Sequence, residues 1–221
     1  MDTATELLIR ITPRSNTIQT EFVQKGVRRC KQVSYDTLVE SIRGSLEKDL
    51  VSSGLLPPGC ISFQAGASGR FITSILHPEL RADISYAGTE YQDFPLPRLV
   101  FKFEHQDGAR VMRSWMGVVG QGLLTPKTPM YHYPFSNVSG YRLCTGNNPM
   151  PVCKSLHTLG SLPYYILAMP NNNDHFNKRH NKPQLEMRDL LELLKDKNPN
   201  FYYSDILIPD SRTLMDFINE N

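Results

Sequence analysis

The chain has 221 residues, of which 40% are hydrophobic and 21% are charged, a composition typical of a globular protein and incompatible with wholesale disorder. The formal net charge is only +2, and its Lys and Arg residues are scattered, so the sequence does not indicate nucleic-acid binding. No apolar run approaches the roughly 20 residues that a membrane helix needs.

The first residues are acidic and polar, unlike a secretory signal, so we expect a soluble protein of the cytoplasm. Four cysteines are present without a CxxC pair or a His spacing suited to zinc: Cys30, Cys60, Cys144 and Cys153. Without an export signal, reduced thiols are expected. The sequence therefore predicts no disulfide, no metal and no cofactor.

The N-terminal part of the chain predicts two strands followed by a helix. Residues 7–11 and 18–23 are β-prone runs. Ser34 is a candidate N-cap, and apolar residues recur every four positions after it: Leu38, Ile42, Leu46 and Leu50. The Gly- and Pro-rich residues 54–59 end this helix.

From residue 60 onward the apolar pattern changes to a period of two, which is typical of strands. Residues 61–63 and 70–75 form one predicted strand pair, and residues 98–103 and 110–115 form another around an Asp-Gly turn. The middle of the chain is therefore predicted to be an antiparallel meander.

The regular pattern fades after residue 120. Residues 121–151 are rich in Pro and Gly, and long irregular segments of this kind in compact domains are usually functional. Helices are predicted over residues 185–194 and from Ser211 onward. The inner face of the second helix would carry its apolar residues: Leu214, Phe217 and Ile218.

Three residues of the irregular segment are candidates for chemistry. Cys144 lies where a thiol can meet a large partner; the alternative is a small buried hydrophobic residue. Asn137 could donate its amide to a developing oxyanion, or it could close an Asx-type turn. His132 could act as a base for the thiol, or it could simply pack between its two neighbouring tyrosines.

Particular stretches of sequence carry a resemblance to a known family. The most specific are residues 128–138 (TPMYHYPFSNV) and 140–146 (GYRLCTG), with support from residues 96–101 and 210–214. A meander followed by a Pro-rich segment, an Asn, a Cys and helices resembles the ubiquitin-conjugating enzyme (UBC) fold. The chain is more similar still, over most of its length, to a prokaryotic branch of that superfamily, PRTRC system protein B.

The resemblance implies an α+β fold: a UBC-like antiparallel β-meander flanked by helices, with an N-terminal strand/helix extension. Residues 1–83 would be an accessory region and residues 84–221 the UBC-like core. UBC enzymes carry His-Pro-Asn before the thioester cysteine, whereas this chain has Phe135-Ser136-Asn137, so only the Asn matches. Relatives often carry a Thr-His-Pro-Asn-like stretch after the active-site region, where this chain has Ala168-Met169-Pro170-Asn171.

The resemblance also implies a function, that of a bacterial cysteine-thioester transferase. Cys144 would accept the C-terminal carboxyl of a ubiquitin-like protein as a thioester and pass it to an amine. The implied partners are that ubiquitin-like protein, an adenylating activating enzyme and a JAB-type metallopeptidase, with no membrane.

Two rival functions stay open at this stage. A non-catalytic UBC-like scaffold would bind the ubiquitin-like protein or its JAB-type peptidase. The presence of Cys144 favours the enzyme, because an inactive scaffold would be free to lose it. A DNA-contacting factor for plasmid maintenance is suggested only by the genetic setting of the family, and the near-neutral charge argues against it.

Overall fold

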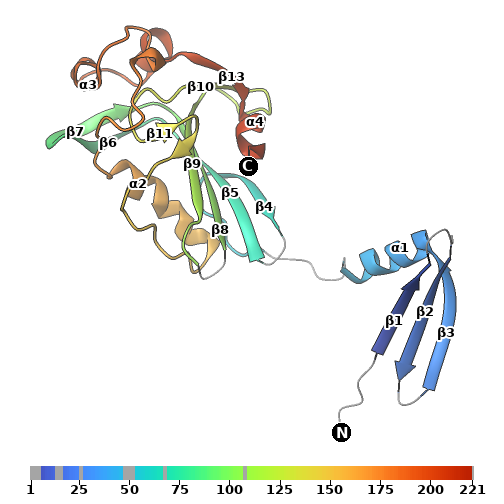
Figure 1. The fold of residues 1–221 in the computed structure, drawn as a ribbon. Helices are drawn as coiled ribbons and strands as arrows, with labels where there is room; N and C mark the ends of the chain where they lie inside the picture. Colours follow the sequence, from blue (N-terminus) through green and yellow to red (C-terminus); the bar gives the residue numbers. More distant parts are fainter. Residues whose placement is uncertain are drawn as a thin grey trace. The chain divides into compact units, whose positions relative to one another are not determined.

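The computed structural model describes residues 6–12, 17–24, 27–46, 53–66, 69–106 and 109–220. The chain forms two compact units, residues 1–52 and 53–221 (Figure 1). Antiparallel sheets combined with a few helices confirm the predicted α+β class. None of the helices in the described ranges has the length and apolar character needed to cross a membrane.

The smaller unit is a three-stranded antiparallel sheet followed by a helix. Its elements are β1 (Glu6–Ile11), β2 (Thr17–Gln24), β3 (Val27–Ser34) and α1 (Tyr35–Leu46). The strands predicted over residues 7–11 and 18–23 are confirmed as β1 and β2. Strand β3 was not predicted, because its charged sequence is almost entirely exposed and lacks an apolar alternation.

The N-cap predicted for α1 is also confirmed. The Ser34 Oγ accepts a hydrogen bond from the Thr37 amide at 3.1 Å, which satisfies one of the free donors of the first turn. The last apolar position of the predicted helix, Leu50, lies outside the described residues.

The larger unit is built on one antiparallel sheet with the strand order β11-β12-β9-β8-β5-β4. Its long strands are β4 (Cys60–Ala65), β5 (Arg70–His77), β8 (Leu99–Gln106) and β9 (Arg113–Val119). Its short strands are β10 (Pro129–Tyr131), β11 (Val138–Ser139), β12 (Arg142–Leu143) and β13 (Pro209–Thr213). The predicted pairs β4–β5 and β8–β9 are confirmed.

A separate hairpin of β6 (Leu80–Tyr86) and β7 (Thr89–Leu96) was not predicted. The domain boundary expected between residues 83 and 84 falls inside β6. Strand β5 pairs with β8 over its whole length, from Arg70↔Gln106 to His77↔Leu99. The strands of residues 60–77 therefore share a sheet with the core, and the two compact units divide at residues 52 and 53 instead.

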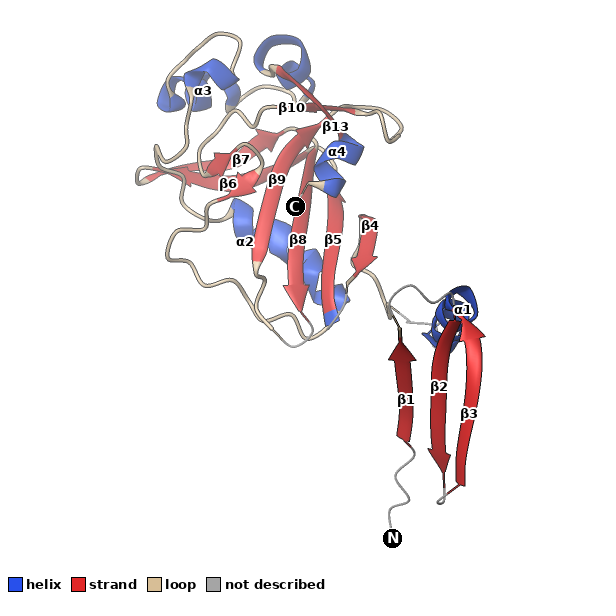
Figure 2. Ribbon diagram, turned by 45° about the vertical axis from the view of Figure 1, so that its right-hand side comes forward, coloured by secondary structure: helices blue, strands red, loops and turns tan. Residues whose placement is uncertain are grey.

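Helices cover both faces of the large sheet (Figure 2). Helix α2 (Leu162–Leu167), which follows the 3₁₀ turn η2 (Leu156–Ser161), packs against one face of the sheet. The same core cluster contains residues of α3 (Met187–Leu194) and of the π-helical turn η4 (Tyr202–Ile206). The helix predicted over residues 185–194 is thus confirmed with a start at Met187.

The other face packs against α4 (Leu214–Asn219), whose Phe217 is fully buried on Tyr141. This helix begins three residues later than Ser211, because β13 occupies the preceding segment. A capping box between Thr213 and Asp216 fixes its start. Lys102, buried under α4, donates from Nζ to the Phe217 and Glu220 carbonyls and so holds the end of the helix.

Candidate functional site

The β11–β12 hairpin carries Cys144 to the edge of the sheet. Val138 pairs with Leu143, and both side chains are buried, which fixes the hairpin on the core. The next pair outward is Asn137 and Cys144, joined by a 2.7 Å hydrogen bond from the Cys144 amide to the Asn137 carbonyl. Cys144 therefore lies directly beyond β12, half-buried, in irregular backbone, as the sequence indicated.

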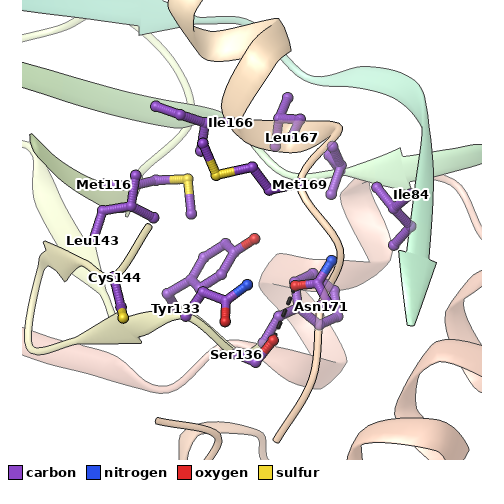
Figure 3. Close-up of a pocket in the computed structure, with 13 residues that line it drawn as sticks. Ile84, Met116, Tyr133, Ser136, Leu143, Cys144, Ile166, Leu167, Met169 and Asn171 are labelled. Carbon is purple, nitrogen blue, oxygen red and sulfur yellow. Dashed lines mark hydrogen bonds between the residues drawn. The ribbon is translucent and has the colours of Figure 1, made fainter. Parts of the chain in front are cut away.

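Cys144 lines a pocket whose walls are mainly apolar (Figure 3). The apolar walls are Ile84, Leu96, Met116, Phe135, Leu143, Ile166, Leu167 and Met169. The other lining residues are Tyr133, Ser136, Asn137 and Asn171. No Asp, Glu, Lys, Arg or His lies among the described residues that line the pocket, so a group entering it meets dipoles rather than charges.

Hydrogen bonds fasten the segment after α2 to the Cys144 hairpin. The Asn137 side-chain amide donates to the Pro170 carbonyl at 3.2 Å. The Ser136 hydroxyl donates to Asn171 Oδ1 at 3.0 Å, and the Asn171 amide in turn donates to the Ser85 carbonyl at 3.3 Å. One wall of the pocket is therefore tied to the chain segment that carries the thiol.

Asn137 is placed by its backbone as well as by its side chain. Its φ of 64° lies in the left-handed region, which Asn tolerates better than most residues. Its backbone amide donates to the Asp174 carbonyl at 2.8 Å. The hydrogen bond of its side chain to Pro170 joins two distant segments rather than closing a local Asx-type turn.

His132 is not among the described residues lining the Cys144 pocket. Its ring stacks on His180 with centroids 4.7 Å apart, and its Nδ1 lies 3.8 Å from Asp210 Oδ2. Burial, and secondly the nearby His132, lower the pKa of His180. Within the described part of the chain, no group of three or more His, Cys, Asp and Glu residues could hold a metal ion.

The other three cysteines are free thiols in different surroundings. Cys153 is buried, and burial raises the pKa of its thiol. Burial also raises the pKa of the half-buried Cys60 thiol in β4. Cys30 is exposed on β3, in the smaller unit. Among the described residues, Cys144 is the cysteine that lines the pocket.

Sequence reasoning missed three pocket residues: Tyr133, Ser136 and Asn171. Tyr133 is buried, as are Phe135 and Tyr141 of the same segment. The position of its hydroxyl in the pocket depends on tertiary structure alone. Asn171 had a sequence signal, because it ends the Ala-Met-Pro-Asn stretch at which this chain departs from its relatives.

An antiparallel meander flanked by helices, with a half-buried cysteine just beyond a strand of the sheet, is the arrangement expected of a UBC-like protein. The family model of Prokaryotic E2 family D matches residues 34–202. This is more than half of the chain, and the chain therefore belongs to that family. Membership links the protein to ubiquitin-like modifier machinery and to a ubiquitin-conjugating-like role. Neither the curated proteins nor the solved structures contained a match to the chain.

Proposed function

We propose that this protein is the conjugating enzyme of a bacterial ubiquitin-like modification system of the PRTRC type. Cys144 would accept the C-terminal carboxyl of the modifier as a thioester and pass it to an amine. One observation carries the proposal: a free, half-buried thiol lines a pocket within the part of the chain that matches an E2 family. The implied partners are the modifier, its adenylating enzyme and a JAB-type peptidase.

The chemistry needs two acyl transfers at one sulfur. In loading, the Cys144 thiolate attacks the activated acyl carbon, a C–S bond forms, and the activating group leaves with its electron pair. In discharge, a neutral amine attacks the same carbon, the C–S bond breaks, and the thiolate leaves while the amine loses a proton to solvent. The thioester conserves the activation between the two steps, because thiolate is a good leaving group.

Asn137 is proposed as the donor to the oxyanion that forms when the amine attacks the Cys144 thioester. Its amide carries two hydrogens, and the bond to Pro170 uses one of them, which leaves the second for a substrate. Because Pro170 and the left-handed backbone fix the amide, donation requires little reorganisation. Loss of one such donor typically costs about 3 kcal/mol of transition-state stabilisation.

The environments of the other cysteines within the matched region favour Cys144 as the nucleophile. The thiolate is the reactive form of a cysteine, and burial raises the pKa of both Cys60 and Cys153. These two thiols are therefore less reactive at neutral pH than ordinary thiols.

The proposal is tested by mixing the protein with its cognate activating enzyme, ATP and the ubiquitin-like protein. A reductant-sensitive covalent adduct should form, and Cys144→Ala should abolish it. The matched controls Cys30→Ala, Cys60→Ala and Cys153→Ala should keep the adduct. Cys144→Ser should form a slower, reductant-resistant oxyester, because a hydroxyl is the poorer nucleophile.

An adduct that survives in Cys144→Ala would refute the assignment of the nucleophile. If proven active partners give no adduct with the wild-type chain, the non-catalytic scaffold becomes the better description. In that case the chain should still bind the modifier or the peptidase without covalent linkage.

A further inference from the structure

Strand β1 of the smaller unit is a free sheet edge with exposed apolar side chains on both of its faces. The strand order of this sheet is β1-β2-β3, so β1 pairs with β2 on one side and, within the described chain, with no strand on the other (Figure 2). An edge of this kind is a template for pairing with another strand. Most of the strand consists of exposed large hydrophobic residues: Leu7, Leu8, Ile9 and Ile11.

The opposite edge of the same sheet has a different chemistry. Strand β3 exposes three cationic side chains: Arg28, Arg29 and Lys31. Charged side chains on an edge strand keep it from pairing with other chains. Because the sheet protects its β3 edge in this way and leaves its β1 edge apolar, β1 points to a specific strand partner.

The hydrophobic core of this unit is small. Among its described side chains, Ile18 is the one hydrophobic residue that is buried, at 2% exposed. Ile11 opposes Ile18, and side chains alternate along a strand, so Leu7, Ile9 and Ile11 share the sheet face of Ile18. Helix α1 contacts β2 and β3. Small domains often complete a core by oligomerisation, and a strand added beside β1 would extend this apolar face.

We propose that β1 pairs antiparallel with β1 of a second copy of this chain, about a two-fold axis. The two three-stranded sheets then form one continuous sheet in the order β3-β2-β1-β1-β2-β3. Strands β1 to β3 precede most of residues 34–202, the part of the chain that matches the E2 family, so this inference does not depend on the chemistry of Cys144. The dimer would bring two conjugating cores into one assembly.

The geometry of antiparallel pairing limits the possible registers. Opposed residues share a face of the sheet, and successive residues alternate between faces. Two identical antiparallel strands must therefore be centred on a residue and not between two residues. Centring the pair on Leu8 opposes Leu8 to itself, Leu7 to Ile9 of the second copy, and position 6 to position 10.

Charge complementarity selects the register centred on Leu8. Positions 6 and 10 are Glu6 and Arg10, so this register opposes residues of opposite charge twice, once on each side of the axis. It also opposes Leu7 to Ile9 on the apolar face. Centring the pair on Leu7 or on Ile9 would instead oppose Leu8 to a charged residue.

An exchange of charges tests the pairing on the intact chain. The wild type should dimerise in analytical ultracentrifugation, and Arg10→Glu should weaken dimerisation by about 10- to 100-fold, because two pairs of opposite charge become two pairs of like charge. Combining Glu6→Arg with Arg10→Glu should restore the dimer. Arg29→Glu is the matched control, because it makes the same charge change on the exposed β3 edge, and it should dimerise like the wild type.

A cross-link tests the register independently. In a Cys30→Ala background, Leu8→Cys with an added oxidant should form a disulfide between the two copies of position 8, because opposed Cα atoms of an antiparallel pair lie about 4.5–5.5 Å apart. Ile9→Cys should cross-link far less, because position 9 opposes position 7. Mass spectrometry of the linked peptides identifies the positions that are joined.

A wild-type chain that stays monomeric at every concentration would overturn the inference, and so would a dimer that Arg10→Glu leaves unchanged. Failure of the double exchange to restore the dimer, or cross-linking at position 9 rather than 8, would overturn the proposed register. Circular dichroism of each variant shows whether it is folded. The cross-link decides the question alone if Arg10→Glu unfolds, because it does not use that variant.

Discussion

Substitutions of Asn137 separate its structural role from its catalytic role, because Gly and Ala remove the same amide with different backbone costs. Asn137→Gly loses the hydrogen bond to Pro170 and keeps the left-handed backbone at no steric cost, so we expect about 1 kcal/mol of lost stability. Asn137→Ala should be about 1–2 kcal/mol less stable than Asn137→Gly, because Ala keeps a Cβ in that region without the polar side chain that lets Asn tolerate it.

The two variants should nevertheless discharge the thioester at similar rates. Both lack the proposed oxyanion donor, so each should transfer the modifier to an amine about 100- to 1000-fold more slowly than the wild type. Loading should slow less than discharge. Unfolding in urea measures the stability term, and single-turnover discharge of a preformed Cys144 thioester to free lysine measures transfer.

Asn148→Ala is the matched control. Asn148 is exposed, lies near Cys144 in sequence, and donates its side-chain amide to the Thr145 carbonyl at 3.0 Å. It should change neither stability nor transfer appreciably. The reasoning is refuted if Asn137→Gly discharges like the wild type while Asn137→Ala is slow, since transfer would then follow backbone strain alone.

Two further predictions concern the frame around the site. The lowered pKa of His180 means that the folded state prefers its neutral ring, so stability should fall as the pH drops below about 6.5, the value in unfolded chains. Melting temperatures measured over a pH series should fall less steeply in His180→Gln than in the wild type, although His132 and Asp210 remain beside the site. The exposed His157→Gln is the control and should follow the wild-type curve. Identical curves for His180→Gln and the wild type would contradict this prediction. Phe217→Ala should lower the free energy of unfolding, measured in urea, by about 3–5 kcal/mol, because the ring is fully buried. Met215→Ala should lower it much less, because Met215 is partly exposed. Equal losses would show that burial of Phe217 does not hold α4 on the sheet.

Regular elements of this chain were predictable where their apolar residues follow a clear period. Strand β8 alternates over Phe101-Lys102-Phe103-Glu104, and α3 combines a helical period with a nearby proline. Strand β5 was recognisable instead as a run of β-branched and aromatic residues beside a glycine turn. The elements that were missed lack such a pattern. Strand β3 is almost wholly exposed, and β7 contains Pro95, which disfavours strand predictions.

The site was predictable only in part for a related reason. Cys144 and Asn137 are seven positions apart, so a short hairpin brings them together, and the sequence could suggest their proximity. Tyr133 and Asn171 join them through packing between segments distant in the chain. Whether a hydroxyl or an amide in the pocket is free to bind a ligand depends on its hydrogen bonds to neighbouring groups. The amino-acid sequence does not show which groups are neighbours in the fold.

Met169 shows how a single position bears on the chemistry of the whole site. It follows Ala168 and precedes Pro170-Asn171, where the resemblance led us to expect a His in relatives. Here its side chain is buried in the pocket wall, beside apolar residues of α2. Among the described residues that line the pocket, only Cys144 and Tyr133 can titrate, and burial keeps the Tyr133 hydroxyl protonated. The pocket wall therefore offers the attacking amine no general base, and its proton must pass to solvent or to a group that a partner brings.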